Sequence, residues 1–498
     1  MKKIKCSFSR GICLLAALLM TALIPMQAQA STMPYDTYCY DWWGEDVLQP
    51  HAYLYSRSLT LPESRLKNPQ DLFVKDDRLY IADTDNSRIV VTNEEGTILM
   101  EITDFQSENG REALSLPQGV FVTEEDHLYV ADSGNGRIVE FTQEGEYIRQ
   151  IGRPETELLS EKQQYIPTKV VVDGAGRIYA IAYGINMGLV EFDRNGEFQG
   201  FMGATQVSVS AFEYIWKNYF STDAQKQRME TIIPTEYSNI FVDEKNFVYA
   251  TISNLSDEDY MNGADAIRRL NPTGTDVLRR LGNNSIIGDL YATSDDADWS
   301  TFTDVAATDY GSYFILDNAG GKIFCYDYDG NSLFIFGGKG GRAGMLKNPT
   351  ALGMNQDQSH IYVVDSQLGS VLVFDITEYG KCLLGALKAH HNGDSQKAYE
   401  LWQEVQRMNA NSEIAYIGIG KTYLREGKYK EAMDCFQLGN SRKYYTKAFQ
   451  YYRKELMQGS FGRYMGVIVG LIVLVFLGNL FKKIKRWVGE AKCNISNP

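Results

Sequence analysis

The side chains best placed to bind a ligand are polar residues near the beginnings of predicted strands. Gln118, Lys169, Tyr237, Asn239 and Asp304 stand at such positions, where a purely structural strand would tolerate apolar residues. Their amide, ammonium, phenol and carboxyl groups exchange hydrogen bonds but form no activated nucleophile. The set predicts binding of a neutral or weakly polar ligand, or of a partner's loop, without a metal ion. We also expect that neither Lys169 nor Asp304 is needed for hydrogen bonds between strands, so that the fold survives their replacement by Ala.

Conventional catalytic motifs are absent from the sequence. It contains no G-x-S-x-G elbow, no phosphate-binding P-loop and no HExxH zinc motif. Its five histidines do not recur at strand beginnings, and His390 and His391 lie in a segment with a helical pattern. We therefore predict no catalytic residue, no metal site and no cofactor.

The elements that carry the polar residues form an internal repeat of about fifty residues. Each copy reads as short strands separated by Asp, Asn and Gly turns, with apolar residues at alternate positions. Units of four strands are typical of the blades of a β-propeller and not of a helical solenoid. Six copies are present, so the fold class that we predict is mainly β, a six-bladed β-propeller. The copies begin near Pro69, Pro117, Pro167, Pro234, Thr303 and Pro349.

The last copy lacks a fourth strand of its own, and residues 53–60 have the composition of one. We predict that this N-terminal strand completes the last blade and closes the ring without an open sheet edge. Each of the other five copies carries a glycine before its fourth strand, as expected for a hairpin turn. These glycines are Gly96, Gly145, Gly196, Gly274 and Gly330.

Two copies carry a short polar signature after the second strand. It reads DTDNSR from Asp83 to Arg88 and DSGNGR from Asp132 to Arg137. This D-x-x-N-x-R pattern resembles that of NHL repeats, and the resemblance covers about residues 53–379, with the signature eroded in the other copies. It implies an NHL-like six-bladed propeller. In our interpretation, the Asp and Arg side chains tie neighbouring strands through charge-assisted hydrogen bonds and contact no ligand.

The resemblance raises two enzymatic alternatives. Calcium-dependent lactonases of the gluconolactonase type hold their ion with carboxylate and amide groups from inner strands. Lys169 would oppose such an ion, and the inner-strand set of Asp71, Gln118, Asn239 and Asp304 contains no Glu. Amidating lyases bind zinc through histidines, which do not recur here at inner-strand positions. An extracellular propeller hydrolase of the gluconolactonase type is kept as the alternative function.

An insertion with a helical pattern, about residues 206–232, separates the third and fourth copies. Trp216 lies in it and is the sixth ligand-binding candidate, because the insertion ends just before Tyr237. Long insertions on a propeller lie at a face. This one is either a cover packed on the blades or a lid or partner contact near the channel mouth. The aromatic-rich residues 35–46 likewise either cover blade edges or stack on a saccharide.

From residue 383 the spacing at which apolar residues recur changes from every 2 residues to every 3.6, which predicts helices over residues 383–457. Small and aromatic residues recur there after 34 positions, a spacing that resembles tetratricopeptide repeats. The resemblance implies a groove for extended peptides or neighbouring proteins, and a plain spacer before the membrane is the alternative. The recurring sets are Gly393, Ala398 and Trp402, followed by Gly427, Ala432 and Phe436.

Both ends of the chain carry apolar segments. Residues 1–30 combine basic residues, a short apolar run and an A-x-A end, which predicts a cleavable secretory signal peptide. Residues 464–481 contain no charge and are long enough for one transmembrane helix. The basic residues of 482–498 predict a cytoplasmic tail. We therefore expect a single-pass protein of the cell membrane with an extracellular N-terminal domain.

The chain of 498 residues contains 49 Lys and Arg against 63 Asp and Glu, a formal charge of −14. This balance excludes nucleic acid as the main partner, because phosphate binding needs a basic surface. Seven cysteines are too few for a disulfide scaffold, and pairing of Cys382 with Cys435 is left open.

These expectations combine into one function, a membrane-anchored extracellular binding or scaffold protein. Its propeller would recognise a ligand or a protein, and the chain could serve as an accessory component of a membrane transport system. The expected partners are a protein at the cell surface or a membrane permease, with a saccharide or a peptide as other ligands. Gly466 and Gly470 form a G-x-x-x-G pattern in the span that permits close packing against permease helices.

Overall fold

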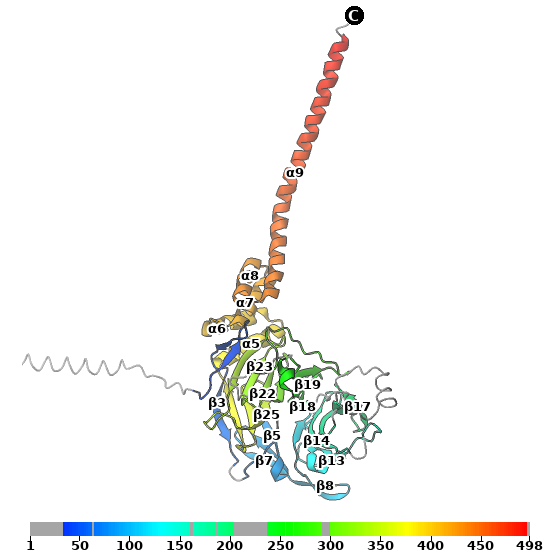
Figure 1. The fold of residues 1–498 in the computed structure, drawn as a ribbon, viewed down its shortest axis with the longest axis vertical. Coiled ribbons are helices and arrows are strands. Elements are labelled where there is room, and N and C mark those ends of the chain that lie inside the picture. The colour runs from blue at the N-terminus through cyan, green and yellow to red at the C-terminus, as the bar shows by residue number, and fades with distance from the viewer. Residues whose placement is uncertain are drawn as a thin grey trace, which may run out of the picture.

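The computed structural model describes residues 33–61, 64–159, 163–185, 187–203, 237–253, 255–261, 263–290 and 299–495. The predicted signal peptide and the insertion at residues 206–232 lie outside the described residues. Figure 1 shows a β-rich domain, a helical segment beside it and one long helix that leads to the C-terminus.

Six antiparallel sheets surround a central axis and follow one another in chain order. The first strand of each sheet is innermost, and the six inner strands contact their neighbours in a closed ring. The predicted six-bladed β-propeller is therefore confirmed.

The strands of the first three blades follow the predicted pattern of four. Blade 1 contains β4 (Asp71–Lys75), β5 (Arg78–Asp83), β6 (Arg88–Asn93) and β7 (Ile98–Ile102). Blade 2 contains β10 (Gly119–Val122), β11 (Leu128–Asp132), β12 (Arg137–Phe141) and β13 (Tyr147–Ile151). Blade 3 contains β14 (Ile166–Val172), β15 (Ile178–Tyr183), β16 (Leu189–Phe192) and β17 (Phe198–Met202). A small hairpin of β8 (Asp104–Ser107) and β9 (Gly110–Ala113) leads from blade 1 to blade 2.

The other three blades vary in strand number. Blade 4 contains β18 (Tyr237–Val242), β19 (Val248–Ile252) and β20 (Ile267–Leu270), with the short helix α4 (Asp257–Met261) after β19. Blade 5 contains β21 (Phe302–Ala307), β22 (Tyr313–Asp317), β23 (Lys322–Tyr326), β24 (Ser332–Gly337), β1 (Tyr38–Tyr40) and β2 (Asp46–Leu48). Blade 6 contains β25 (Pro349–Met354), β26 (His360–Asp365), β27 (Ser370–Ile376) and β3 (Tyr53–Leu59).

Strand β3 closes the ring. It pairs antiparallel with β27, from Tyr53 opposite Ile376 to Leu59 opposite Val371. Closure of the last blade by the N-terminal strand is thus confirmed, and the five hairpin glycines all have φ between 76° and 88°. A side chain at such positive φ values would be strained, which explains why glycine occupies these turns.

Blades 4 and 5 depart from the predicted four strands. After Gly274 the expected outer strand of blade 4 is reduced to one bridge, between Leu270 and Asp276. Blade 5 is extended instead, because β1 pairs with β24. The Tyr38 and Tyr40 hydroxyls both donate to Asp289, at 2.5 and 2.9 Å, so this aromatic segment covers a blade edge as one of the two interpretations expected.

Four helices after the propeller form two antiparallel hairpins. They are α5 (Glu378–His391), α6 (Ser395–Met408), α7 (Glu413–Arg425) and α8 (Tyr429–Leu438). Gly393 and Gly427 make the tight turns, with φ of 81° and 77°. The indole of Trp402 packs on Gly418 of the next hairpin, where a side chain would overlap it. The 34-residue spacing therefore corresponds to two successive helical hairpins, and the tetratricopeptide assignment itself stays a prediction.

The helical segment is packed against the propeller and does not hang from a linker. One buried apolar cluster contains Phe374 of blade 6 together with Leu383, Trp402 and Val405. Thr377 caps α5 and donates its hydroxyl to the His51 carbonyl, 2.5 Å away, just before β3. The start of the ring-closing strand and the first helix are therefore fixed to each other.

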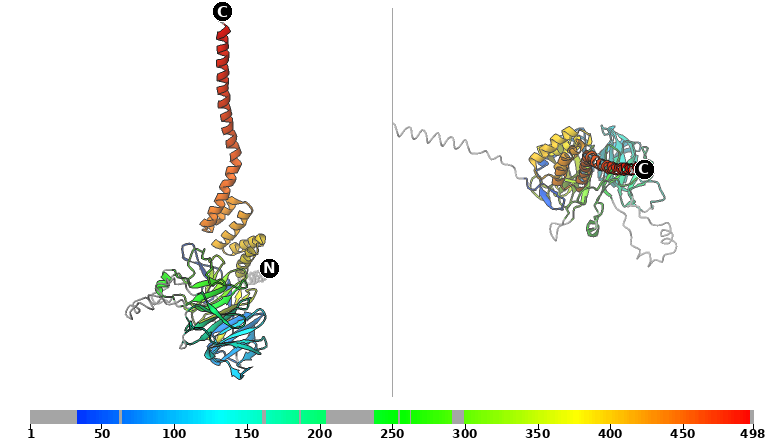
Figure 2. Two further views of the ribbon diagram at one scale, coloured as in Figure 1. Left: turned by 90° about the vertical axis from the view of Figure 1, so that its right-hand side faces the viewer. Right: turned by 90° about the horizontal axis from the view of Figure 1, so that it is seen from above.

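Helix α9 (Arg442–Ile495) begins in the helical segment and rises away from the propeller (Figure 1 and Figure 2). Within its residues Tyr464–Val488, the most apolar stretch of 18 residues has a mean hydropathy of 2.4 and is not covered by other described parts of the chain. By length and composition this segment can cross a membrane, and it contains the predicted span of residues 464–481.

Candidate functional site

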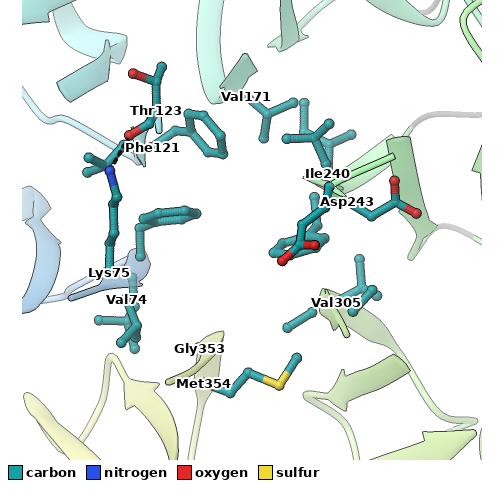
Figure 3. A pocket seen from close by; sticks show the side chains of 18 of the residues that line it. Val74, Lys75, Phe121, Thr123, Val171, Ile240, Asp243, Val305, Gly353 and Met354 are labelled. Atoms are coloured by element: carbon teal, nitrogen blue, oxygen red, sulfur yellow. Dashed lines mark hydrogen bonds between the residues drawn. The ribbon is translucent and has the colours of Figure 1, made fainter. Parts of the chain in front are cut away.

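The six inner strands enclose a cavity of about 740 Å³ along the propeller axis. Residues from all six blades line it, and one residue of α5, Lys388, reaches its edge. Figure 3 shows side chains from different blades converging around this space.

One position at the beginning of each inner strand contributes to a ring that we call the floor of the cavity, and the four polar members of this ring line the cavity itself. The alignment of the six copies brings together two small residues and four polar ones, and all six are buried. In blade order they are Asp71, Gly119, Lys169, Asn239, Asp304 and Ala351. The structure thus brings together three of the predicted candidates, Lys169, Asn239 and Asp304, and adds Asp71.

An ion pair between blades 1 and 3 is the main contact of the floor. The Lys169 Nζ donates to Asp71 Oδ1 at 2.6 Å, and Val120 of blade 2 donates its N–H to Asp71 Oδ2 at 2.8 Å. Lys169 reaches past blade 2 because Gly119 has no side chain, and a Cβ there would overlap the backbone of blade 3. The Lys169 and Asp71 side chains are 11% and 10% exposed, so the pair is almost fully withdrawn from water.

Asp304 links blade 5 to blade 6. Its Oδ2 accepts from the Leu352 N–H at 2.6 Å and its Oδ1 from its own neighbour Val305 at 2.7 Å. Burial raises the pKa of Asp304 to about 7, although Lys169 and the two N–H donors favour the charged form, and the Asp71 carboxylate adds to the increase. The Asp304 carboxyl therefore keeps its proton to a higher pH than an exposed aspartate does.

These contacts correct one expectation drawn from the sequence. Lys169 and Asp304 were expected to take no part in hydrogen bonds between strands, yet each connects two blades. The error arose because the partners, Asp71 and Leu352, lie in other copies of the repeat.

Asn239 differs from the other floor residues in its hydrogen bonding. It is 2% exposed, and its Oδ1 accepts from the Ile240 N–H at 2.7 Å. Its Nδ2 group has no hydrogen-bond partner within the described part of the chain. A buried donor without a partner costs free energy, so an acceptor that reaches the floor would be stabilising there.

The remaining candidates are not part of the cavity lining. Gln118 precedes the floor position of blade 2 and its backbone pairs with Ala131. The Tyr237 hydroxyl donates to the Gly203 carbonyl at 2.5 Å, across to the end of blade 3. Trp216 lies outside the described residues.

The walls above the floor are apolar. Phe73 and Phe121, from blades 1 and 2, contact each other with ring centroids 4.8 Å apart. Val171, Val305 and Met354 continue the apolar surface around the other blades (Figure 3). A ligand body in contact with these walls would be aliphatic or aromatic.

The mouth of the cavity lies at the turns between the first and second strands of the blades. Acidic residues are frequent in these turns, and sequence reasoning missed them because it considered strand beginnings and not strand ends. The acidic residues that line the mouth are Asp76, Asp77, Glu124, Glu125, Asp173, Asp243, Glu244 and Asp309.

Helix α5 borders this mouth. Its Lys388 lies 3.7 Å from the Asp309 carboxylate, and its His391 contacts Lys245 of blade 4 at 3.3 Å. The propeller face with the open end of the cavity is therefore the face that carries the helical segment.

The polar signature of blades 1 and 2 lies apart from the cavity and has the structural role expected for it. Asp83 accepts from Asn86 at 2.8 Å and from Arg88 at 2.6 Å, and also from the backbone of Lys67 at 2.7 Å. Asp132 repeats this arrangement with Asn135 and Arg137, both at 2.8 Å. Each Asp is fully buried, so the signature fixes the turn and the preceding connection.

Within the described ranges, no group of three or more His, Cys, Asp or Glu side chains has an arrangement suited to a metal ion. Cys39, Cys325, Cys382 and Cys435 are free thiols in this structure, so Cys382 and Cys435 do not pair.

Comparison with known proteins gives a family match for part of the propeller. A family model of the NHL repeat matches residues 114–141, which hold most of blade 2. No curated protein matches the sequence.

Several solved structures resemble the chain at low identity. A streptogramin B lyase shares 10% identity, with 66% of this chain and 100% of that chain covered and a TM-score of 0.39. A gluconolactonase from Xanthomonas campestris shares 10% identity, with coverage of 69% and 95% and a TM-score of 0.41. A virginiamycin B lyase from Staphylococcus aureus shares 11% identity, with coverage of 64% and 99% and a TM-score of 0.39.

The closed ring of six inner strands, the two polar signatures and the family match agree with one another. The chain is a six-bladed β-propeller protein that carries an NHL repeat, followed by a helical segment and one apolar helix long enough to span a membrane.

Proposed function

We propose that this protein is a membrane-anchored binding protein whose propeller receives a ligand in its central cavity, outside the cell. The observation that carries the proposal is the cavity, with polar groups from four blades on its floor and apolar walls above them. Its volume of about 740 Å³ falls within the roughly 300–1,000 Å³ that is usual for small-molecule sites.

A lactonase-type hydrolase is the weaker candidate. A calcium ion on the floor would need the Asp71 carboxylate, which is already paired with Lys169 at 2.6 Å. No contact on the floor favours this activity over binding.

The proposed membrane arrangement follows from α9. Between Arg442 and Tyr464 the helix has 22 residues, or about 33 Å at 1.5 Å per residue, before the apolar segment begins. This length would hold the propeller clear of the membrane surface. The basic residues after position 481 favour the cytoplasmic side for the tail.

The helical hairpins and the span supply two surfaces for a protein partner, such as a cell-surface protein or a permease. Gly466 and Gly470 meet no other described part of the chain, so a partner helix could approach them closely. Co-purification of the full chain from detergent-solubilised membranes tests this role. Replacing both glycines by Ile should remove a helix-bound partner, and a partner retained by this variant must bind elsewhere.

The proposed ligand site is tested with a cavity-filling variant. The full chain and the Val171→Trp variant are purified in detergent and then denatured. The small molecules that they release are identified by mass spectrometry. We expect a molecule that is released from the wild type and absent from Val171→Trp, because the larger side chain occupies the cavity. Leu99→Trp, at a 52% exposed position of β7 outside the cavity, is the matched control and should retain the molecule. Identical release from all three proteins would refute the site.

The proposed orientation has its own test. Protease added to intact cells should digest the propeller and leave an epitope placed after Pro498 protected. Detection of that epitope without permeabilisation would show that the orientation is reversed.

A further inference from the structure

The side chains that line the cavity are strongly acidic in sum. Ten carboxyl groups and only three lysines line it. All three lysines are occupied, since Lys169 pairs with Asp71, Lys75 with Asp126 and Lys388 with Asp309. The cavity therefore has an excess of negative charge even after these pairs form.

Most of this excess lies at the rim. Five rim carboxylates are exposed and have no ion pair within the part of the chain that the structure describes. They come from the turns of blades 1, 2 and 4, which face the same opening, so their fields add at the entrance. These residues are Asp76, Asp77, Glu124, Glu125 and Glu244.

The floor has a different chemistry. Lys169 and Asp71 neutralise each other there, so a cation gains less at the floor than at the rim. The Nδ2 group of Asn239, on a side chain that is nearly fully buried, has no partner in the described residues. Asn239 lines the cavity, and a neutral oxygen acceptor that displaced the neighbouring floor atoms slightly would pair with this group. The inner strand from Asp71 to Asp76 separates floor and rim by about 16 Å.

We infer that the cavity binds a small organic cation with its positive charge at the rim, its apolar body along the walls and a neutral hydrogen-bonding group on the floor. This inference rests on the proposed function, that the cavity is a ligand site, and refines the neutral or weakly polar ligand expected from the sequence. The aromatic ring of Phe121 and the side chains of Val171 and Met354 surround the space that the body would occupy (Figure 3). The rim carboxylates favour a ligand that carries a positive charge over a neutral or anionic one.

A matched series of three probes tests the charge preference. They are 4-hydroxyphenethylamine, 4-ethylphenol and 3-(4-hydroxyphenyl)propionate, which share a phenol and differ in the charge of the other end. Binding to the detergent-solubilised full chain is measured by calorimetry at about 0.02 M and about 0.5 M salt, where the screening length falls from about 20 to about 4 Å. We expect the amine to bind about tenfold or more tightly than the propionate at low salt, and the ratio to shrink at high salt.

Two triple variants separate the rim from the overall charge of the protein. The first variant combines Glu124→Gln, Glu125→Gln and Glu244→Gln. In this variant the amine should bind only about one to three times as tightly as the propionate. The second variant combines Glu95→Gln, Glu144→Gln and Glu146→Gln. It changes the net charge of the protein by the same amount as the first, at exposed positions outside the cavity. This control should keep the wild-type ratio.

The possible failures differ in meaning. If the three probes bind the wild type equally and Val171→Trp abolishes binding, the cavity is a ligand site but the inferred charge is wrong. If the propionate binds best, the inferred charge is also overturned. If the amine binds Val171→Trp as tightly as the wild type, or no probe binds, both the inferred cation and the proposed site lose their support.

Discussion

Replacing Lys169 by Met should destabilise the propeller, because it leaves the Asp71 carboxylate buried without its cation. The two groups are 2.6 Å apart, and each side chain is about nine-tenths buried. Removing one partner of such a pair costs about 3–5 kcal/mol. Asp71 would keep its hydrogen bond from the Val120 N–H, and water in the cavity can reach it, so we expect a loss of about 2–3 kcal/mol.

The assay is urea unfolding of the detergent-solubilised full chain at pH 7.5, followed by circular dichroism in the β-sheet region. A double variant, Lys169→Met with Asp71→Asn, provides the internal comparison because it removes the unpaired charge. We expect it to be about 1–2 kcal/mol more stable than Lys169→Met alone. The control is Lys381→Met, whose pair with Glu378 is exposed on both sides and should be worth less than about 0.5 kcal/mol.

Two results would refute this reasoning. If Lys169→Met unfolded at the same urea concentration as the wild type, the ion pair would not support the ring. If the double variant were no more stable than the single one, the loss would come from packing of the lysine side chain and not from the charge on Asp71.

Three further predictions address the ring, the helical segment and the floor. Deleting Tyr53–Leu59 should leave β27 unpaired and cause aggregation or loss of the thermal transition, whereas deleting residues 31–43 should be milder; equal melting of both would contradict closure by β3. Gly418→Val should destabilise the helical segment by about 2 kcal/mol through overlap with Trp402, with Gly341→Ala as a neutral control, and unchanged helical melting would contradict this packing. Burial raises the pKa of Asp304 from 3.8 to about 7. As pH rises, the unfolded chain therefore releases this proton at a lower pH than the folded protein does, so the free energy of unfolding should fall between about pH 4 and 7. Asp304→Asn should reduce that fall, and an unchanged pH profile would show that Asp304 does not titrate in this range.

The sequence predicted the ring well because the relevant signals are local. Alternating apolar residues, hairpin glycines and the signature from Asp83 to Arg88 each describe a few neighbouring residues, and the structure repeats them blade by blade. The missing fourth strand of the last copy is informative because a sheet edge left open is unfavourable. That deficit, together with the strand composition of residues 53–60, is sufficient to predict the pairing between β3 and β27.

The cavity was predicted only in part, because its contacts join distant copies. Lys169, Asn239 and Asp304 were identified by their polar character at strand beginnings. The partner of Lys169, Asp71, lies two blades away and can be reached only because Gly119 lies between them. Asp71 was placed on an inner strand but not among the binding candidates, although an alignment of the copies at Pro69 and Pro167 puts it at the position equivalent to Lys169. The acidic rim was missed because Asp and Glu in turns are common and give no signal by themselves.

The blade irregularities could not be predicted from the repeat. The fourth strand of blade 4 is lost although Gly274 is present with φ of 76°. Blade 5 gains β1 and β2 because the hydroxyls of Tyr38 and Tyr40 find a shared acceptor, Asp289. That contact spans about 250 positions in the sequence, which no local pattern encodes.

The central claim, a ligand-binding cavity that lies outside the cell, is tested most directly by a cysteine in the cavity wall. Met354→Cys places a thiol inside the cavity, and Leu99→Cys places one on the outer edge of blade 1. Both are expressed in intact cells and treated with a membrane-impermeant maleimide, with the unsubstituted chain as background for the native thiols. We predict that both thiols are labelled from outside and that 4-hydroxyphenethylamine slows the labelling of the thiol at position 354 only. Labelling that requires permeabilised cells, or that is unaffected by the amine at position 354, would contradict the account.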